Sequence, residues 1–183
     1  AYTAVDKAES ERELAFQINA TSVGLLAAIC RDNNTKFLHF STDYVFDGNA
    51  TEPYKIDDTT NPQTVYGASK LKGEKLAMDE NSDAIIIRTS WVFSSYGKNF
   101  VKTMQKLTAE KDHLKVVFDQ VGTPTYAGDL ADVIYRVIEN EMLDKLGIYH
   151  FSNEGVISWY DFAKEICELS GNTCDIEPCH SDE

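Results

Sequence analysis

Short, continuous apolar segments alternate along the chain with segments whose apolar residues recur every three or four positions. The continuous segments are Phe37–Phe40, Ala84–Thr89, Leu114–Phe118 and Gly147–Phe151. Their length and their β-branched and aromatic content predict buried parallel strands. Helical spacing predicts helices between them. The first follows a loop within Ala1–Arg31, and the next three are Tyr66–Asp79, Asn99–Lys111 and Asp129–Glu139. A last helix begins at Ser158, which is expected to form a capping box with Asp161.

This alternation predicts an α/β fold whose strands pair in parallel through right-handed crossovers. The segment Asp47–Gln63 is rich in Gly, Asn, Asp and Pro, and we expect it to form a long surface loop. In such sheets the functional groups gather at the carboxyl ends of the strands. Thr42 and Trp91 each follow a predicted strand, and Tyr66 lies on the helix between those strands. We therefore expect these three side chains to share one crevice.

Composition and charge narrow the class of protein. The 183 residues, 43% of them hydrophobic and 26% charged, are ordinary for a soluble globular protein with one core and a small second lobe. A formal net charge of −13 argues against nucleic acid and anionic membranes as partners, without excluding a local basic pocket for a phosphorylated ligand. No apolar run approaches the roughly 20 residues of a membrane span. We therefore expect a cytoplasmic protein without a nucleic-acid or membrane partner.

The four cysteines are Cys30, Cys167, Cys174 and Cys179, and we expect reduced thiols at all of them. Cys174, Cys179 and His180 lie close together in the sequence, which raises the question of a metal site. They lack a Cys-x-x-Cys knuckle and a second pair of ligands. We therefore expect no metal at these residues.

The candidate chemistry centres on Tyr66-Gly67-Ala68-Ser69-Lys70. A tyrosine and a lysine four positions apart lie on one face of a helix. An ammonium group there stabilises a phenolate, so a phenol whose ordinary pKa is about 10 would exchange protons nearer neutrality. Such a pair suits a general acid or base that acts on a carbonyl or a carbinol. The same spacing also occurs on many solvated helices that have no catalytic role.

The other candidates have structural interpretations as well. Trp91 could be an ordinary core residue, since tryptophan is intermediate in burial. The hydroxyl of Thr42 could serve only to satisfy main-chain groups at the end of a strand. His39 lies within an apolar strand, where a hydrogen-bonded core histidine is more common than a catalyst.

Longer motifs resemble the extended short-chain dehydrogenase/reductase superfamily. The likeness lies in Ser41-Thr42-Asp43-Tyr44-Val45-Phe46-Asp47-Gly48, Pro53-Tyr54, Asp57, Pro62, Tyr66-Gly67-Ala68-Ser69-Lys70 and Gly73-Glu74. With Ala1-Tyr2-Thr3-Ala4-Val5-Asp6-Lys7-Ala8-Glu9 and Arg88-Thr89-Ser90-Trp91-Val92, the resemblance narrows to the dTDP-4-dehydrorhamnose reductase family. It runs along nearly the whole chain and is densest from Ala1 to Val92.

The resemblance implies a role for each matched residue. Tyr66 would protonate the C4 oxygen of a keto sugar as hydride arrives from NADPH or NADH, and Lys70 would lower the pKa of Tyr66 and bind the nicotinamide ribose. Thr42 would hydrogen-bond the reacting oxygen, Thr42 and Asp43 would contact the sugar, and Trp91 would pack against it. The residues implied to line the dinucleotide are Ala1, Tyr2 and Thr3, together with Tyr66 and Lys70.

The implied reaction is the NAD(P)H-dependent reduction of dTDP-4-dehydro-L-rhamnose to dTDP-L-rhamnose, whose chemistry needs no metal. Some family members carry a divalent cation at a dimer contact, which implies Mg²⁺ and a homodimer, but no ligand set is matched here. Two alternatives remain: a non-catalytic regulatory subunit like the β subunit of methionine adenosyltransferase, and another nucleotide-sugar epimerase or dehydratase. Trp91 favours the reductase over the first, and Thr42-Asp43 favours it over the second.

One part of the family pattern is missing. The chain has no G-x-G-x-x-G-like turn of the kind that holds a dinucleotide pyrophosphate. We expect a fragment that lacks this turn and the C-terminal end of the family, and that alone binds cofactor poorly and is inactive. Residues 1–92 and 114–152 are expected to form an incomplete nucleotide-binding Rossmann domain without its N-terminal strands. Residues 93–113 and 153–183 are expected to form a smaller sugar-nucleotide-binding lobe.

Overall fold

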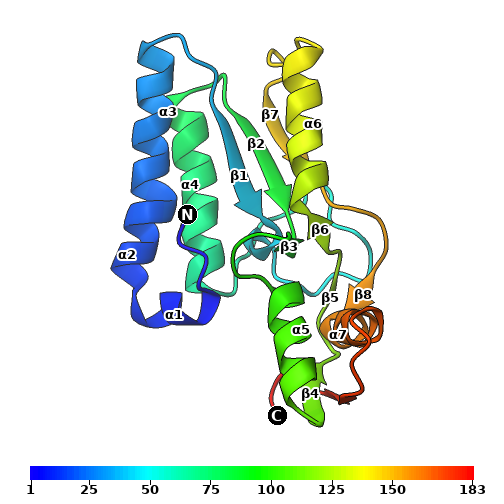
Figure 1. Cartoon of the computed structure of the whole chain (residues 1–183). Helices are drawn as coiled ribbons and strands as arrows, with labels where there is room; N and C mark the ends of the chain where they lie inside the picture. The colour runs from blue at the N-terminus through cyan, green and yellow to red at the C-terminus, as the bar shows by residue number, and fades with distance from the viewer. The chain divides into compact units, whose positions relative to one another are not determined.

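The computed structural model describes all residues from 1 to 183 and divides the chain into two compact units. Unit 1 consists of residues 1–89 and 135–151, and unit 2 consists of residues 90–134 and 152–183. The predicted alternation of strands and helices is confirmed (Figure 1). Residues 90–92, 114–134 and 152, which were expected in the nucleotide-binding domain, lie in unit 2 of this division, and the domain assignment stays a prediction. Strand β4 (His113–Val117) pairs with β9 (Asp175–Cys179) and does not join the larger sheet.

Unit 1 is built on a three-stranded parallel sheet in the order β1-β2-β7. These strands are β1 (Leu38–Thr42), β2 (Ile85–Thr89) and β7 (Gly147–His150). The register of β1 and β2 places Thr42 directly opposite Thr89 at the carboxyl end of both strands. Strand β2 is central, and its three isoleucines are buried on both faces, which explains its uninterrupted apolar sequence.

The helices of unit 1 pack along α4 (Val65–Glu80), as Figure 1 shows. The segment before β1 contains four helical elements: α1 (Val5–Ser10), α2 (Arg12–Phe16), the π-helix η1 (Gln17–Thr21) and α3 (Ser22–Asp32). Val23 and Ala27 of α3, Ala77 of α4 and Ile86 of β2 form a buried cluster. Helix Arg12–Asp32 is long and apolar enough to cross a membrane by length and composition alone. A mostly buried core helix of a soluble protein meets the same criterion; in this helix Val23 and Ala27 are buried, whereas Leu25, Leu26 and Ile29 are exposed.

Unit 2 contains three two-stranded sheets. Strands β3 and β6 pair in parallel, as do β4 and β9, whereas β5 and β8 pair antiparallel. Its further elements are β3 (Val92–Phe93), α5 (Phe100–Glu110), β5 (Val121–Gly122), β6 (Thr125–Tyr126), β8 (Ile157–Ser158) and α7 (Trp159–Leu169). Helix α6 (Ala127–Glu139) begins in unit 2, and its last residues belong to unit 1.

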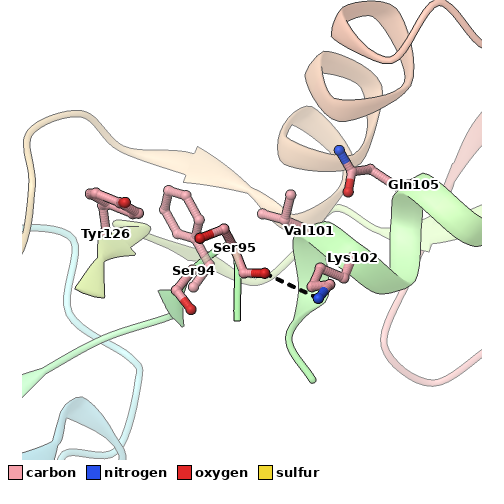
Figure 2. A pocket seen from close by; sticks show the side chains of 7 residues that line it. Ser94, Ser95, Val101, Lys102, Gln105 and Tyr126 are labelled. Carbon is pink, nitrogen blue, oxygen red and sulfur yellow. Dashed lines mark hydrogen bonds between the residues drawn. The ribbon is translucent and has the colours of Figure 1, made fainter. Parts of the chain in front are cut away.

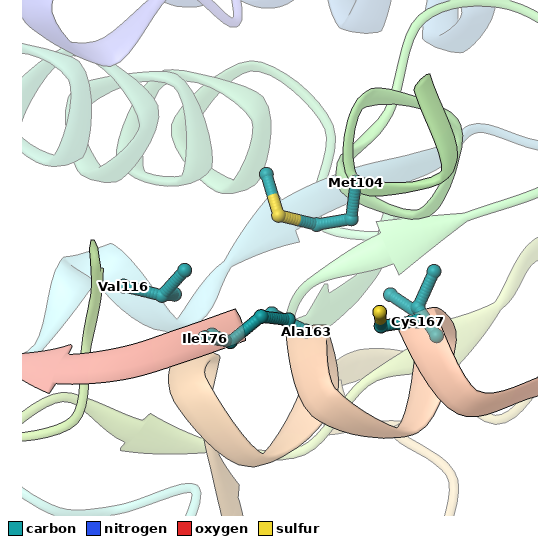
Figure 3. Close-up of a cluster of buried hydrophobic side chains, with 6 residues drawn as sticks. Met104, Val116, Ala163, Cys167 and Ile176 are labelled. Carbon is teal, nitrogen blue, oxygen red and sulfur yellow. The ribbon is translucent and has the colours of Figure 1, made fainter. Parts of the chain in front are cut away.

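The core of unit 2 lies where α5 and α7 pack on the β4–β9 pair. Figure 3 shows Met104 of α5 above Val116, Ile176, Ala163 and Cys167, the side chains of the strand pair and of α7. The predicted capping box of α7 is confirmed: the main-chain N–H of Asp161 donates to Ser158 Oγ at 3.0 Å, and that of Ser158 donates to the Asp161 carboxylate at 2.8 Å. This cap fixes the start of α7.

Candidate functional site

Thr42 is held by a local cap at the end of β1. The chain turns there into the 3₁₀-helix η2 (Asp43–Val45). Thr42 Oγ1 accepts a hydrogen bond from the main-chain N–H of Tyr44 at 3.3 Å and donates to the Asp43 carboxylate at 3.0 Å. The residue is only 5% exposed. Thr42 therefore offers a hydroxyl of fixed position at the carboxyl end of a strand, where open α/β sheets bind ligands.

Tyr66 is the second residue of α4, and the start of this helix is tied down twice. Thr64 caps the helix by accepting a hydrogen bond from the N–H of Gly67 at 3.0 Å, and the Glu9 carboxylate accepts one from the N–H of Val65 at 2.8 Å. The Tyr66 ring meets the ring of Tyr44 edge-on, with 5.5 Å between centroids. The cap and the ring contact together fix the position of the phenol.

The structure brings Thr42, Asp43 and Tyr66 together. Burial raises the pKa of the Tyr66 phenol, and the negative charge of Asp43 adds to this, whereas a hydrogen bond with Thr42 opposes it. Tyr66 is therefore protonated at neutral pH, which is the form that a proton donor requires.

The predicted effect of Lys70 on Tyr66 does not appear in this structure, because the ammonium group has other partners. Lys70 Nζ donates to the main-chain carbonyl of Phe40 at 2.5 Å and lies 3.4 Å from His39 Nε2. Burial lowers the pKa of Lys70 to about 8, against the opposing charge of Glu74. A contact with a main-chain carbonyl cannot be recognised in a sequence. The i, i+4 spacing therefore predicted Tyr66 as the only partner of Lys70.

Two further titratable groups near this site have shifted pKa values. Burial raises the pKa of Asp43 to about 6, although hydrogen bonds from Thr42 and from main-chain N–H groups favour its charged form. Burial, followed by the nearby Lys70 ammonium, lowers the pKa of His39 to about 4. His39 is therefore a neutral, hydrogen-bonded residue, as its apolar strand predicted.

Asn19 is a residue of this region that the sequence analysis missed. Its side chain accepts a hydrogen bond from the N–H of Tyr2 at 2.8 Å and donates to the Tyr2 carbonyl at 2.8 Å and to Ser69 Oγ at 3.0 Å. Tyr2 and Tyr66 pack against the same small cluster of buried side chains. Asn19 thus attaches the start of the chain to the turn of α4 that carries Lys70. A buried amide within an apolar helix was the available signal.

Two glycines of α4 allow the close approaches that this geometry requires. A Cβ on Gly67 would collide with the main-chain carbonyl of Tyr44, and a Cβ on Gly73 would collide with that of Asn19. Ala1 and Thr3, which were also predicted to line a dinucleotide, are exposed. Their predicted contact with a cofactor stays a prediction.

Trp91 belongs to unit 2, whereas Thr42, Asp43, Tyr66 and Lys70 belong to unit 1. Its place in a shared crevice therefore stays a prediction. Within unit 2 its indole stacks on that of Trp159, with 3.5 Å between ring centroids and 12° between planes. Trp159 is a second aromatic residue that the sequence analysis did not single out.

Unit 2 contains a cavity of about 320 Å³ beside the first turns of α5. It is lined by Phe93, Ser94, Ser95, Val101, Lys102, Gln105 and Tyr126. Figure 2 shows Lys102 at its edge, where Nζ donates to the carbonyl of Ser95 at 3.1 Å. The cavity thus combines an aromatic wall with hydroxyl groups and one cation.

One group of exposed side chains has the spacing of metal ligands: His113, Asp175 and Glu177, on β4 and β9. The His113 ring lies 3.6 Å from each carboxylate, and all three side chains are exposed. The cysteines are free thiols, as predicted. His180, the third member of the cysteine-rich segment, lies against the ring of Phe118 and 3.5 Å from Asp119.

Comparisons with known proteins cover the whole chain. A family model described as the RmlD substrate binding domain matches residues 1–183. A dTDP-4-dehydrorhamnose reductase of Aggregatibacter actinomycetemcomitans is 48% identical over 166 residues, which are 89% of this chain and 56% of that protein. The chain thus spans little more than half the length of this curated relative.

Solved structures agree with this match. The crystal structure of a dTDP-4-dehydrorhamnose reductase from Clostridium acetobutylicum superposes with a TM-score of 0.94 at 45% identity, covering 100% of this chain and 64% of that one. The Bacillus anthracis enzyme of the same name, solved in complex with NADP, gives a TM-score of 0.94 at 40% identity with the same coverage.

Proposed function

The chain belongs to the RmlD substrate binding domain family, and from this membership we propose that the protein carrying it reduces the 4-keto group of dTDP-4-dehydro-L-rhamnose to give dTDP-L-rhamnose, with NADPH or NADH as reductant. The observation that carries the proposal is the meeting of Thr42 and Tyr66 at the carboxyl end of β1. A cytoplasmic location, where the soluble cofactor and the nucleotide sugar are made, is part of the proposal.

Each residue of the proposed site has a task that fits its surroundings. Hydride addition builds negative charge on the ketone oxygen, and donors aimed at that oxygen are the main catalytic need. Tyr66 is protonated and fixed by Tyr44, so it can give its proton to the oxygen. Thr42 would turn its hydroxyl hydrogen to the same oxygen, giving up the hydrogen bond that it now donates to Asp43, and the Asp43 carboxyl beside it would bind a sugar hydroxyl. Trp91 would supply an apolar surface for the sugar ring.

The residues present fit the nicotinamide end of a cofactor. An ammonium group has three N–H donors, and the Phe40 carbonyl and the His39 ring account for two of those of Lys70. The third can be donated to a ribose hydroxyl. When bound, the nicotinamide supplies the hydride, and the chain's own residues bind and orient the ketone and deliver the proton. The Gly-rich turn for the pyrophosphate is not within these residues.

The experiment follows NADPH oxidation by the complete protein when the 4-keto nucleotide sugar is added. Replacing Tyr66 by Phe removes the proton donor but keeps the ring, so we expect kcat to fall by a factor of 10² or more, within the range of general acid catalysis. Tyr135→Phe is the matched control, because Tyr135 is 59% exposed and its hydroxyl bonds only Glu139.

Full activity in Tyr66→Phe would refute the assignment of the proton donor. A wild-type protein that does not oxidise NADPH but binds a methionine adenosyltransferase would favour the regulatory-subunit alternative.

A further inference from the structure

The backbone of Trp91 has an unusual conformation that its surroundings enforce. Its φ angle is +46°, in the left-handed region, which glycine adopts readily and where a bulky residue is a true outlier. The Trp91 carbonyl accepts a hydrogen bond from the N–H of Thr125 at 3.2 Å, which holds the strained turn in place. Strain of this kind persists only where neighbouring groups over-determine it, and it is common at ligand sites.

The indole of Trp91 is held by contacts along one edge of the ring and on one face of it. Its edge lies against Gly122, where a Cβ would approach the indole atoms Cε2, Cζ2 and Nε1 to within 2.8–3.0 Å. Its face lies on Trp159 with 3.5 Å between centroids. Aromatic pairs usually keep their centroids roughly 4.5–7 Å apart, so this overlap is unusually close. Gly122 is therefore needed for the fit, and Trp159 determines the plane of the ring.

Trp159 is itself held firmly. It is the first residue of α7, directly after the Ser158 cap, and its ring also contacts Phe100 of α5 with 4.5 Å between centroids. The helix cap, the Phe100 ring and the Trp91 ring leave Trp159 little freedom to rotate. Trp91 is partly buried, so part of its surface remains accessible.

We propose that Trp159 is a positioning residue which, with Gly122, holds the Trp91 indole as a flat apolar platform for the sugar ring of a nucleotide-sugar ligand. The ligand class rests on the proposed function. A deoxyhexose presents C–H groups and a methyl group on one side of its ring, and such a surface packs well on a large aromatic face. The nucleoside diphosphate part of the ligand would not touch this platform.

The stack has a spectroscopic signature that does not depend on any activity. The chain contains two tryptophans, and two indoles at this distance give an exciton couplet in circular dichroism that needs both rings. We expect Trp91→Phe and Trp159→Leu to remove the same couplet. Phe162→Leu is the control, because the ring contacts of Phe162 are with Phe93 and Phe100. A wild-type protein without the couplet would overturn the proposal.

Calorimetry on the complete protein tests the role in binding, with dTDP-L-rhamnose and dTDP as probes. In Trp159→Leu we expect the Kd of dTDP-L-rhamnose to rise about tenfold, and that of dTDP to change by less than about twofold, since only the sugar rests on the platform. Trp159→Phe should restore part of the loss. Because binding of the product is measured, a lack of reductase activity would refute the proposed function and leave this test valid.

Gly122→Ala provides a second route to the same result if Trp159→Leu does not fold. The added Cβ displaces the Trp91 edge and leaves Trp159 in place, so the couplet should be lost and the Kd of dTDP-L-rhamnose should rise similarly. Loss of the couplet with an unchanged Kd for dTDP-L-rhamnose, in either variant, would show that the stack serves only packing.

Discussion

The ion pair between Arg88 and Glu74 is expected to be a main determinant of the stability of unit 1. The guanidinium of Arg88 donates from Nε and Nη2 to the two carboxylate oxygens of Glu74 at 2.9 and 2.7 Å. Both side chains are almost completely buried, at 5% and 2% exposure. Arg88 also lies 5.1 Å from the centroid of the Phe46 ring. The pair thus joins β2, α4 and the segment that follows β1.

Replacing Arg88 by Met keeps an unbranched apolar stem, which is shorter than the arginine side chain, and leaves a buried carboxylate without its partner. Breaking a buried pair in this way costs about 3–5 kcal/mol of unfolding free energy, a large share of the roughly 5–15 kcal/mol of a typical protein. The double variant Arg88→Met with Glu74→Leu removes both charges, and we expect it to recover most of this loss. Urea unfolding followed by circular dichroism measures both values.

The matched control is Arg31→Met, the same substitution in an exposed pair. Arg31 is half-exposed and pairs with Asp32 and Glu80, so its loss should cost at most about 1 kcal/mol. If Arg88→Met costs no more than Arg31→Met, or if the double variant is no more stable than the single one, the reasoning about the buried charge is wrong.

Three further predictions concern single residues. Asn19→Ala leaves the main-chain groups of Tyr2 without their partner and should cost about 1–3 kcal/mol, with faster proteolysis near residue 2 than in Asn33→Ala. Asp43 has a folded pKa of about 6 against an ordinary 3.8; its contribution is therefore fully present below pH 3.8 and lost as the pH rises through about 6. The stability of the wild type relative to Asp43→Asn should fall over that window by about 2 kcal/mol, and a flat difference would contradict the shift. Ser158→Ala removes the α7 cap and should cost about 1 kcal/mol, whereas Ser170→Ala, at the other end of α7, should cost little.

The strands of the larger sheet could be predicted from the sequence to within two residues at each end, because buried parallel strands are short, continuous apolar runs. Strand β9 could not, since Glu177 and Pro178 interrupt its apolar character and it is recognisable only through its partner β4. The two-residue strands of unit 2 have no periodicity to detect. The pairing of β4 with β9 could not be predicted either, because a sequence shows that a strand exists and does not show which strand it pairs with.

Part of the candidate site could likewise be predicted from the sequence, and part of it could not. The proximity of Thr42 and Tyr66 follows from a strand end and a helix start, which the sequence marks clearly. The partners of Lys70, a main-chain carbonyl and a histidine ring, depend on the depth at which α4 packs on β1. Asn19 and Trp159 escaped notice because each acts through another residue, and such support becomes visible only in three dimensions.

The π-helix η1 has a consequence for insertions and deletions in this part of the chain. Asn19 lies in its wide turn, which holds one residue more than an α-helical turn. Because the wide turn already absorbs the extra residue, deleting one residue there would restore regular α-helical geometry and keep the faces of the flanking turns, whereas inserting a residue outside η1 would rotate everything on one side of it by about 100°. Such an insertion would either turn Asn19 away from Tyr2 and Ser69 or move Val23 and Ala27 out of the core. We therefore expect this segment to tolerate the loss of one residue within η1 better than an insertion on either side of it.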